Sequence, residues 1–172
     1  VTDKAANAAV AIASSGAKQA TAYEADSKKP TLQSYFLNME TGVMSVTFDE
    51  IMKISSFNAN SVFSLQSDLA ADGATETSGT LAGAVTSVAN AKVVEITLSA
   101  ARTGAANAIR AKTGLATDAT NTFLTLASTF MTDVDDNTVN VVASNAAKKV
   151  TASGFKADGV APSIQSFELD LS

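Results

Sequence analysis

Short stretches in which apolar and polar residues alternate recur along the chain, and this pattern predicts β-strands. Residues 32–39 and 43–48 alternate in this way, and the turn-forming residues Glu40-Thr41-Gly42 lie between them, so a hairpin is expected. Further strands are predicted at residues 61–65, 80–88, 92–98, 122–126, 137–143 and 148–156.

Two segments depart from this alternation. Residues 99–112 are rich in alanine, with apolar residues at helical spacing; Ser99 is suited to cap a helix and Gly114 to end it. Residues 68–79 have few apolar side chains and are expected to form an exposed loop. The sequence therefore predicts an all-β fold, a β-sandwich with one short helix.

The two ends of the chain are copies of one segment. Residues 1–18 match residues 131–148 at a constant offset, and residues 23–39 match residues 155–171 after an insertion of two residues in the later copy. The match is clearest where Pro-Thr-Leu-Gln-Ser, starting at Pro30, faces Pro-Ser-Ile-Gln-Ser. A segment that recurs in phase at both ends indicates a repeat of about 130 residues.

The repeat divides the chain at two prolines. Pro30 and Pro162 each follow a predominantly polar stretch, as expected where proline stiffens a link between domains. We interpret residues 1–29 as the C-terminal strands of a preceding repeat, residues 30–161 as one complete repeat, and residues 162–172 as the first strand of the next. The flanking strands then belong to neighbouring modules.

The opening of the complete repeat resembles a known family. Residues 30–39 read Pro-Thr-Leu-Gln-Ser-Tyr-Phe-Leu-Asn-Met, and residues 42–50 read Gly-Val-Met-Ser-Val-Thr-Phe-Asp-Glu. This pattern resembles the first two strands of the tandem Ig-like (bacterial-Ig-like) repeats of secreted surface and filament proteins of microbes and algae. Residues 93–99, 122–126 and 132–139 resemble later landmarks of that module. The resemblance implies an Ig-like β-sandwich with an extracellular structural role, often glycosylated, and brings no catalytic residues.

One departure from the family concerns a turn. Related modules tend to have glycine just before the asparagine of an Asp…Asn turn, whereas Asp136 and its repeat counterpart Ala6 stand there. The departure affects the expected type of turn and leaves the predicted fold unchanged.

The composition of the chain excludes several kinds of catalytic and metal site and argues against some partners. The chain has no histidine and no cysteine, which excludes imidazole catalysis, Cys-His nucleophiles, disulfides and the usual zinc sites. A net charge of −5 argues against nucleic acid as a partner, and no apolar run is long enough for a membrane span. Asp49, Glu50 and Glu95 are interpreted as solvated or capping carboxylates rather than a glycosidase pair. We expect neither an enzyme nor a cofactor.

A cluster of oxygen-bearing side chains lies in the second copy of the repeated segment. Such oxygens suit calcium, and equally an Asx-rich turn between strands. The other copy retains only Asp3 and Asn7, so no calcium requirement is expected. The candidate ligands are Asp133, Asp135, Asp136 and Asn137.

Glycosylation is expected through hydroxyl groups. The chain has no Asn-x-Ser/Thr sequon, so conventional N-linked glycans are not expected, whereas threonine and serine are abundant. The hydroxyls placed in or beside the predicted exposed loop, and therefore candidates for O-linked glycans, are Thr75, Thr77, Ser78 and Thr80.

The fractional repeats predict self-assembly. The complete repeat takes its first strand from residues 31–39 and its last strands from residues 131–158. Residues 1–29 and 162–172 are therefore surplus, and we expect them to pair with strands of other copies. Head-to-tail contacts of this kind do not close and generate filaments. The side chains expected in the shared strands are Ile164, Phe167, Leu169, Leu171, Val10 and Ile12.

The sequence therefore favours a structural subunit of an extracellular filament or surface fibre. In a continuous array the same contacts would be covalently consecutive, and the role would still be a fibre. The alternative is a cell-surface adhesin whose loops bind a glycan. Two tyrosines and no tryptophan offer little aromatic surface for stacking on sugars, which disfavours that alternative.

Overall fold

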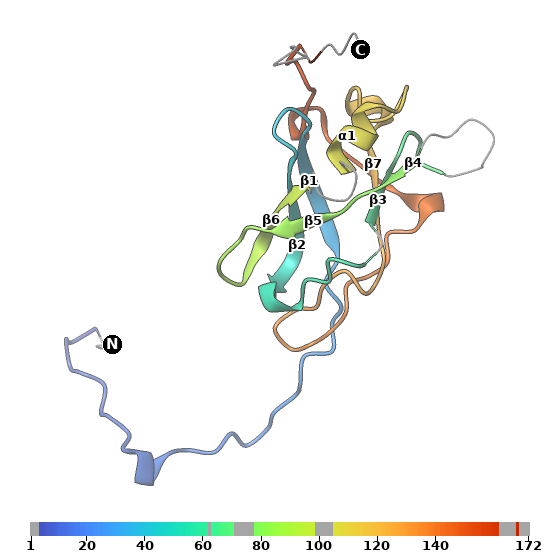
Figure 1. The fold of residues 1–172 in the computed structure, drawn as a ribbon. Helices are drawn as coiled ribbons and strands as arrows, with labels where there is room; N and C mark the ends of the chain where they lie inside the picture. The colour runs from blue at the N-terminus through green and yellow to red at the C-terminus, as the bar shows by residue number, and fades with distance from the viewer. Residues whose placement is uncertain (1–3, 62, 71–77, 99–104, 162–167, 169–172) are drawn as a thin grey trace.

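A computed structural model describes residues 4–61, 63–70, 78–98, 105–161 and 168. Two β-sheets form the body of the structure, with the strand orders β5-β6-β2-β1-β9 and β4-β3-β7-β8 (Figure 1). The strands are β1 (Leu32–Asn38), β2 (Val43–Met52), β3 (Phe63–Gln66), β4 (Ser78–Thr80), β5 (Gly83–Val85), β6 (Ala91–Leu98), β7 (Phe123–Leu126), β8 (Lys148–Lys149) and β9 (Phe155–Lys156). The helices are α1 (Ala105–Arg110) and the 3-10 turns η1 (Ser14–Gly16), η2 (Ile54–Ser56), η3 (Ala119–Asn121), η4 (Ser144–Ala146) and η5 (Ala152–Gly154).

The prediction of a mostly β protein with a short helix is confirmed. β1 pairs antiparallel with β2, with Leu37 opposite Met44, and the hairpin turn uses Gly42 at a φ of 70°. A positive φ at this position suits glycine, which has no Cβ to clash. The helix expected over residues 99–112 is observed as α1; residues 99–104 lie outside the described residues.

The single strand predicted over residues 80–88 is wrong in its extent. The structure divides it into β4 and β5, which lie in different sheets, and β4 begins at Ser78, inside the predicted loop. Leu81 and Ala82 are both buried, so the chain crosses the interior here instead of alternating between two faces. Gly83 allows the crossing, because a Cβ there would lie 2.7 Å from a backbone oxygen of β6.

The strand predicted over residues 148–156 is divided in the same way. β8 joins the four-stranded sheet, β9 joins the five-stranded sheet, and η5 turns the chain between them. Gly154 passes so close to β1 that a Cβ there would lie 2.8 Å from the carbonyl oxygen of Tyr35. The strand predicted over residues 137–143 is reduced to isolated bridges at Thr138 and Val142.

The core lies between the two sheets and follows the alternation of the sequence. On β2, Met44, Val46 and Phe48 are buried, and the residues between them are half-buried. Fully buried Phe130 packs edge-on against Phe63 of β3, with ring centroids 5.4 Å apart. Each such side chain contributes roughly 1.5–3 kcal/mol through its removal from water. Other buried core residues are Leu37, Leu65, Val94, Ile96, Leu124, Leu126 and Val150.

Tyr35 of β1 links the two sheets. Its buried hydroxyl donates a hydrogen bond of 2.9 Å to the carbonyl oxygen of Thr122, just before β7. Burial raises the pKa of the Tyr35 phenol, because the charged form would lose its hydration. Its position identifies Tyr35 as a structural residue.

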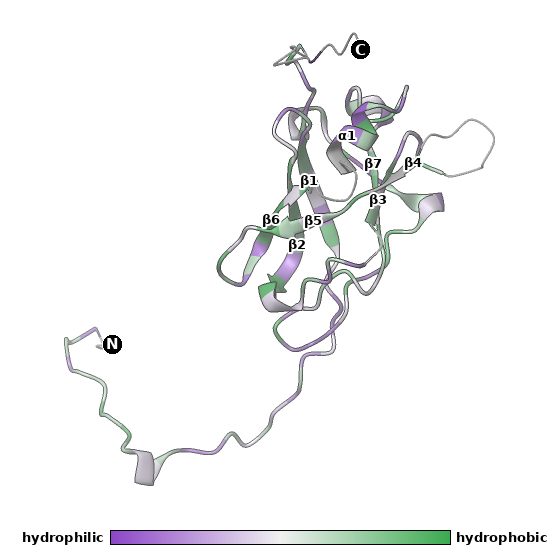
Figure 2. Ribbon diagram, viewed as in Figure 1, coloured by the Kyte–Doolittle hydropathy of each residue, from purple (hydrophilic) through white to green (hydrophobic). Residues whose placement is uncertain are grey.

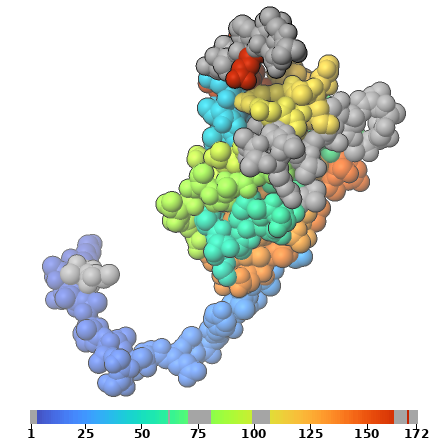
Figure 3. Space-filling model, in the orientation of Figure 1, coloured from blue at the N-terminus to red at the C-terminus, as the bar shows by residue number. Residues whose placement is uncertain are grey.

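The chain enters and leaves the two-sheet body at opposite ends. Pro30 is buried just before β1, and β9 runs parallel to β1, with Phe155 opposite Leu37 near the far end of that strand. We call these the Pro30 end and the Asp158 end. Residues 4–29, the N-terminal tail, are exposed throughout and extend away from the Pro30 end (Figure 1 and Figure 3).

The residues expected in shared strands fall in two places. Val10 and Ile12 lie in the N-terminal tail and are 91% and 65% exposed. Figure 2 shows hydrophobic as well as hydrophilic residues along this tail. The remaining expected contacts lie outside the described residues; they are Ile164, Phe167, Leu169 and Leu171. Of the expected glycan sites, Ser78 and Thr80 lie in β4, and Thr75 and Thr77 lie outside the described residues.

Candidate functional site

At the Pro30 end, two asparagines fasten the end of the N-terminal tail to the two-sheet body. The Asn137 side-chain amide donates to the carbonyl oxygen of Asp26 at 3.2 Å. The Asn140 side-chain amide donates to the Lys29 carbonyl oxygen at 3.3 Å and to the Thr31 hydroxyl at 2.9 Å, and the Asn140 backbone N–H donates to the Pro30 carbonyl oxygen at 2.8 Å. Both asparagines belong to the second copy of the repeated segment, so that copy holds the link that precedes its own module.

A salt bridge reinforces the same link. The Lys28 ammonium lies 2.8 Å from Asp49 Oδ2 and also binds Glu50 Oε1, and the Thr31 backbone N–H donates to Asp49 Oδ1 at 2.7 Å. The hydrogen bond from Lys28, followed by that from Thr31, lowers the pKa of the Asp49 carboxyl. The hydrogen bonds of Lys28 to Asp49 and, second, to Glu50 raise the pKa of the Lys28 ammonium.

Three carboxylates converge beside this link. Asp26, Glu50 and Asp133 each place an oxygen within 4.8 Å of the other two, and we call them the acidic cluster. The Asp133 residue is 2% exposed. Glu50 Oε2 is buried and has no hydrogen-bond partner among the residues that the structure describes. The negative charge of the acidic cluster is therefore only partly compensated, by Lys28.

The predicted calcium ligands form a turn instead of one convergent group. Asp133 Oδ1 accepts hydrogen bonds from the backbone N–H groups of Asp135, at 2.9 Å, and Asn137, at 2.8 Å. Asp136 points elsewhere and binds the ammonium of Lys53 at 2.7 Å. The geometry is that of an Asx turn. Carboxylate oxygens of the kind that calcium takes converge in the acidic cluster, to which the predicted set contributes only Asp133.

The proximity of Asp26 and Glu50 to Asp133 does not follow from sequence pattern, because the three residues come from distant segments. One signal was available in the repeat itself. Asp26 has Asp158 as its counterpart, and Asp133 has Asp3, so two of the three carboxylates occur in both copies of the repeated segment.

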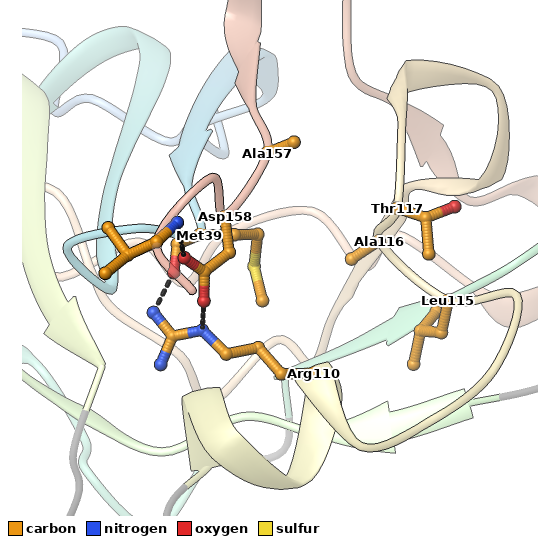
Figure 4. A pocket seen from close by; sticks show the side chains of 8 residues that line it. Met39, Arg110, Leu115, Ala116, Thr117, Ala157 and Asp158 are labelled. Atoms are coloured by element: carbon orange, nitrogen blue, oxygen red, sulfur yellow. Dashed lines mark hydrogen bonds and ion pairs between the residues drawn. The ribbon is translucent and has the colours of Figure 1, made fainter. Parts of the chain in front are cut away.

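At the Asp158 end, Arg110 holds the segment through which the chain leaves. Arg110 Nε lies 2.8 Å from Asp158 Oδ2 (Figure 4), and Nη1 donates to Asn107 Oδ1 at 2.7 Å. Nη2 donates to the carbonyl oxygens of Met39 and Glu40, which follow β1. Arg110 ends α1, so the helix directs this guanidinium toward both the hairpin turn and the outgoing chain.

A hollow of about 300 Å³ lies next to this guanidinium. Its walls combine apolar side chains with the Arg110–Asp158 ion pair (Figure 4). It is lined by Met39, Arg110, Leu115, Ala116, Thr117, Ala157, Asp158 and Val160.

The two links share a local conformation. Asp26 Oδ1 accepts a hydrogen bond of 2.9 Å from the backbone N–H of Lys28, and Asp158 Oδ1 accepts one of 3.1 Å from that of Val160. These are the same Asx turn at repeat-equivalent positions. Both links lie against the same two-sheet body: the link at Asp26 precedes that body in the sequence, and the link at Asp158 follows it.

The remaining candidate carboxylate, Glu95, lies exposed on β6 and accepts a hydrogen bond of 3.0 Å from the Thr86 hydroxyl.

Comparison with known proteins yields no matching family model, no matching curated protein and no matching solved structure. Within the described ranges, none of the helices has both the length and the apolar character needed to cross a membrane.

Proposed function

We propose that this chain is a structural segment of an extracellular filament or surface fibre, in which Ig-like β-sandwich modules follow one another head to tail and share β-strands between protomers or consecutive repeats. One observation carries the proposal. The N-terminal tail resembles residues 134–161 in sequence, yet only the second copy is built into the two-sheet body, and the tail is exposed.

The second copy is firmly built into the body. Val139, Ala147 and Val150 are at most 3% exposed, and Phe155 extends the five-stranded sheet beside β1. A close-packed interior leaves no room for a duplicate of this segment. The N-terminal tail does not share this place, which supports an arrangement in which the tail completes a different module and several modules follow in a row.

The N-terminal tail leaves apolar surface uncovered. Val10 is 91% exposed and Tyr23 is 83% exposed, although the counterpart of Tyr23 is Phe155, which lies in β9. Exposed apolar side chains in a segment that is built to pair with a sheet favour association with a partner edge. The positions of Pro30 and Asp158 at opposite ends support a linear arrangement of modules.

Removal of residues 162–172 tests strand sharing at the C-terminal end. We expect the full-length chain to form filaments visible by negative-stain electron microscopy and the shortened chain to remain monomeric by light scattering. If the shortened chain polymerises as readily as the full-length chain, strand sharing at this end is wrong. A matched pair separates side-chain docking from a general effect of added charge: Phe167→Asp with Leu169→Asp should block assembly, whereas Gln165→Asp with Ser166→Asp should weaken it less.

A further inference from the structure

We propose that the acidic cluster of one module binds the guanidinium of Arg110 from the preceding copy. This inference rests on the proposed head-to-tail arrangement and names the charged contact that fixes each joint. The inference starts from the repeat, in which Asp26 and Asp158 occupy equivalent positions and form the same Asx turn. Asp26 shows how this position contacts the body that follows it, and Asp158 shows how it contacts the body that precedes it.

The two sets of contacts use different atoms and are therefore compatible in one residue. Seen from the module that follows, Asp26 offers its backbone carbonyl oxygen to Asn137. Seen from the module that precedes, Asp158 offers Oδ2 to Arg110. In both links Oδ1 accepts the backbone N–H of the Asx turn, from Lys28 or from Val160. A link that joins two modules makes both sets of contacts: those of Asp26 with the following module and those of Asp158 with the preceding module. The Arg110 guanidinium of the preceding module then lies on the carboxylate of Asp26.

That placement brings a positive charge to the acidic cluster, whose negative charge Lys28 compensates only in part. Asp26 lies within 4.8 Å of the Glu50 and Asp133 carboxylates, and Glu50 Oε2 is buried with no partner in the described part of the chain. Three adjacent carboxylates repel one another unless a cation compensates them. Lys28 binds only one oxygen of Glu50, so a second cation is favoured.

Arginine suits this position better than lysine would. Its guanidinium is permanently charged, weakly hydrated and able to serve several acceptors at once. Arg110 uses Nε for Asp158, Nη2 for two carbonyl oxygens, and one N–H of Nη1 for Asn107. Because Nη1 carries two hydrogens, one N–H remains for a further carboxylate of the acidic cluster.

A tandem chain makes the complete joint accessible to measurement. Residues 1–154 followed directly by residues 23–172 place the Asp26 link between two copies of the module. The chain has no cysteine, so Val88→Cys in both modules, at a 99% exposed position, introduces two sites for spin labels. Double electron–electron resonance then reports the distribution of distances between the modules. We expect one narrow peak, because the Arg110 contact fixes their relative orientation.

The matched control is the same substitution in the other module. Arg110→Gln in the first module removes the contact at the joint and should abolish the narrow peak. Arg110→Gln in the second module loses the same bonds to Met39 and Glu40 but faces no joint, so the peak should remain. Asp26→Asn at the joint should broaden the distribution as well, although it leaves α1 untouched. Circular dichroism confirms that each variant is folded.

Three outcomes would overturn the proposal: a broad distribution in the unsubstituted tandem chain, equal effects of the two Arg110 substitutions, or a narrow peak that calcium restores in the Arg110→Gln joint. The last result would identify a metal ion as the occupant. The tandem joint is covalent, so the result does not depend on polymerisation. A narrow peak in a chain that forms no filaments would support the Arg110 contact and refute strand sharing between protomers. Filaments with a broad peak would support strand sharing between protomers and refute the Arg110 contact.

Discussion

The N-terminal tail and residues 134–161 are two copies of one segment in different surroundings. Ala6 and Asp136, at equivalent positions, have φ values of 65° and 68°, and the 3-10 turns η1 and η4 also coincide in the repeat. Ala17 after η1 is nevertheless exposed, whereas Ala147 after η4 is 3% exposed. The backbone shape is thus encoded locally, and burial is decided by the presence of the two sheets.

This difference has a physical reason. Turns of three to five residues are stabilised by hydrogen bonds within the segment itself, such as those of Gly16 to Ala13 and of Ala146 to Ala143. Burial depends on contacts with residues far away in the sequence, and those contacts are available to only one of the two copies. The unpacked copy therefore keeps the turn conformations that it would need to pack against another module.

The largest effect is expected from a charge placed at the position of Ala147. Ala147→Asp buries a carboxylate without a cation and should lower the free energy of unfolding by about 3–5 kcal/mol. Ala17→Asp makes the same change in the exposed copy and should stay within about 0.5 kcal/mol. Urea denaturation followed by circular dichroism measures both. Similar losses in the two variants would show that the N-terminal tail is packed.

The next effect concerns a position where the two copies differ. Gly154 lies between the two matched stretches, where the later copy has two additional residues, and a Cβ at Gly154 would meet the carbonyl oxygen of Tyr35 at 2.8 Å. Gly154→Ala should therefore lower the free energy of unfolding by about 1–3 kcal/mol. Gly159→Ala, with no atom within 4 Å of the added Cβ, is the control and should be neutral.

The sequence predicted the features that depend on local pattern. The β1–β2 hairpin and the helix α1 follow from periodicity and from turn residues near Gly42 and Gly114. The division at Leu81 and Ala82 could not be predicted, because consecutive apolar residues are as compatible with a buried strand as with a crossing between sheets. The repeat marks Asp26 and Asp133 as recurring carboxylates, but the sequence could not predict that they meet Glu50, since the three residues come from segments that only the fold brings together.

A smaller effect is expected at the link itself, where Lys28 has Val160 as its counterpart and the two links differ in charge. The pKa of Asp49 is lowered in the folded state, so its contribution is present above the ordinary carboxyl pKa and is lost on acidification through the lowered value. Asp49→Asn should reduce stability at pH 7 by less than about 1 kcal/mol, as for other exposed ion pairs.

The measurement is the difference in melting temperature between the unsubstituted chain and Asp49→Asn as the pH falls from 7 to 2. The difference should shrink below about pH 4, the ordinary carboxyl range. Lys28→Ala removes the same salt bridge and should show the same dependence in the acidic range. A difference that stays constant down to pH 2 would contradict the assigned role of the salt bridge.

The smallest effect is expected from removal of calcium. The turn around Asp133 is closed by hydrogen bonds from Asp135 and Asn137, and the first copy retains the left-handed conformation at Ala6 although it has alanine at both middle positions. A bound ion is therefore unnecessary for the shape of this turn. Addition of a chelator should leave the melting temperature of the full chain unchanged, as measured by circular dichroism. A large fall would show that calcium compensates the acidic cluster in the isolated chain, which would give that cluster an occupant other than arginine.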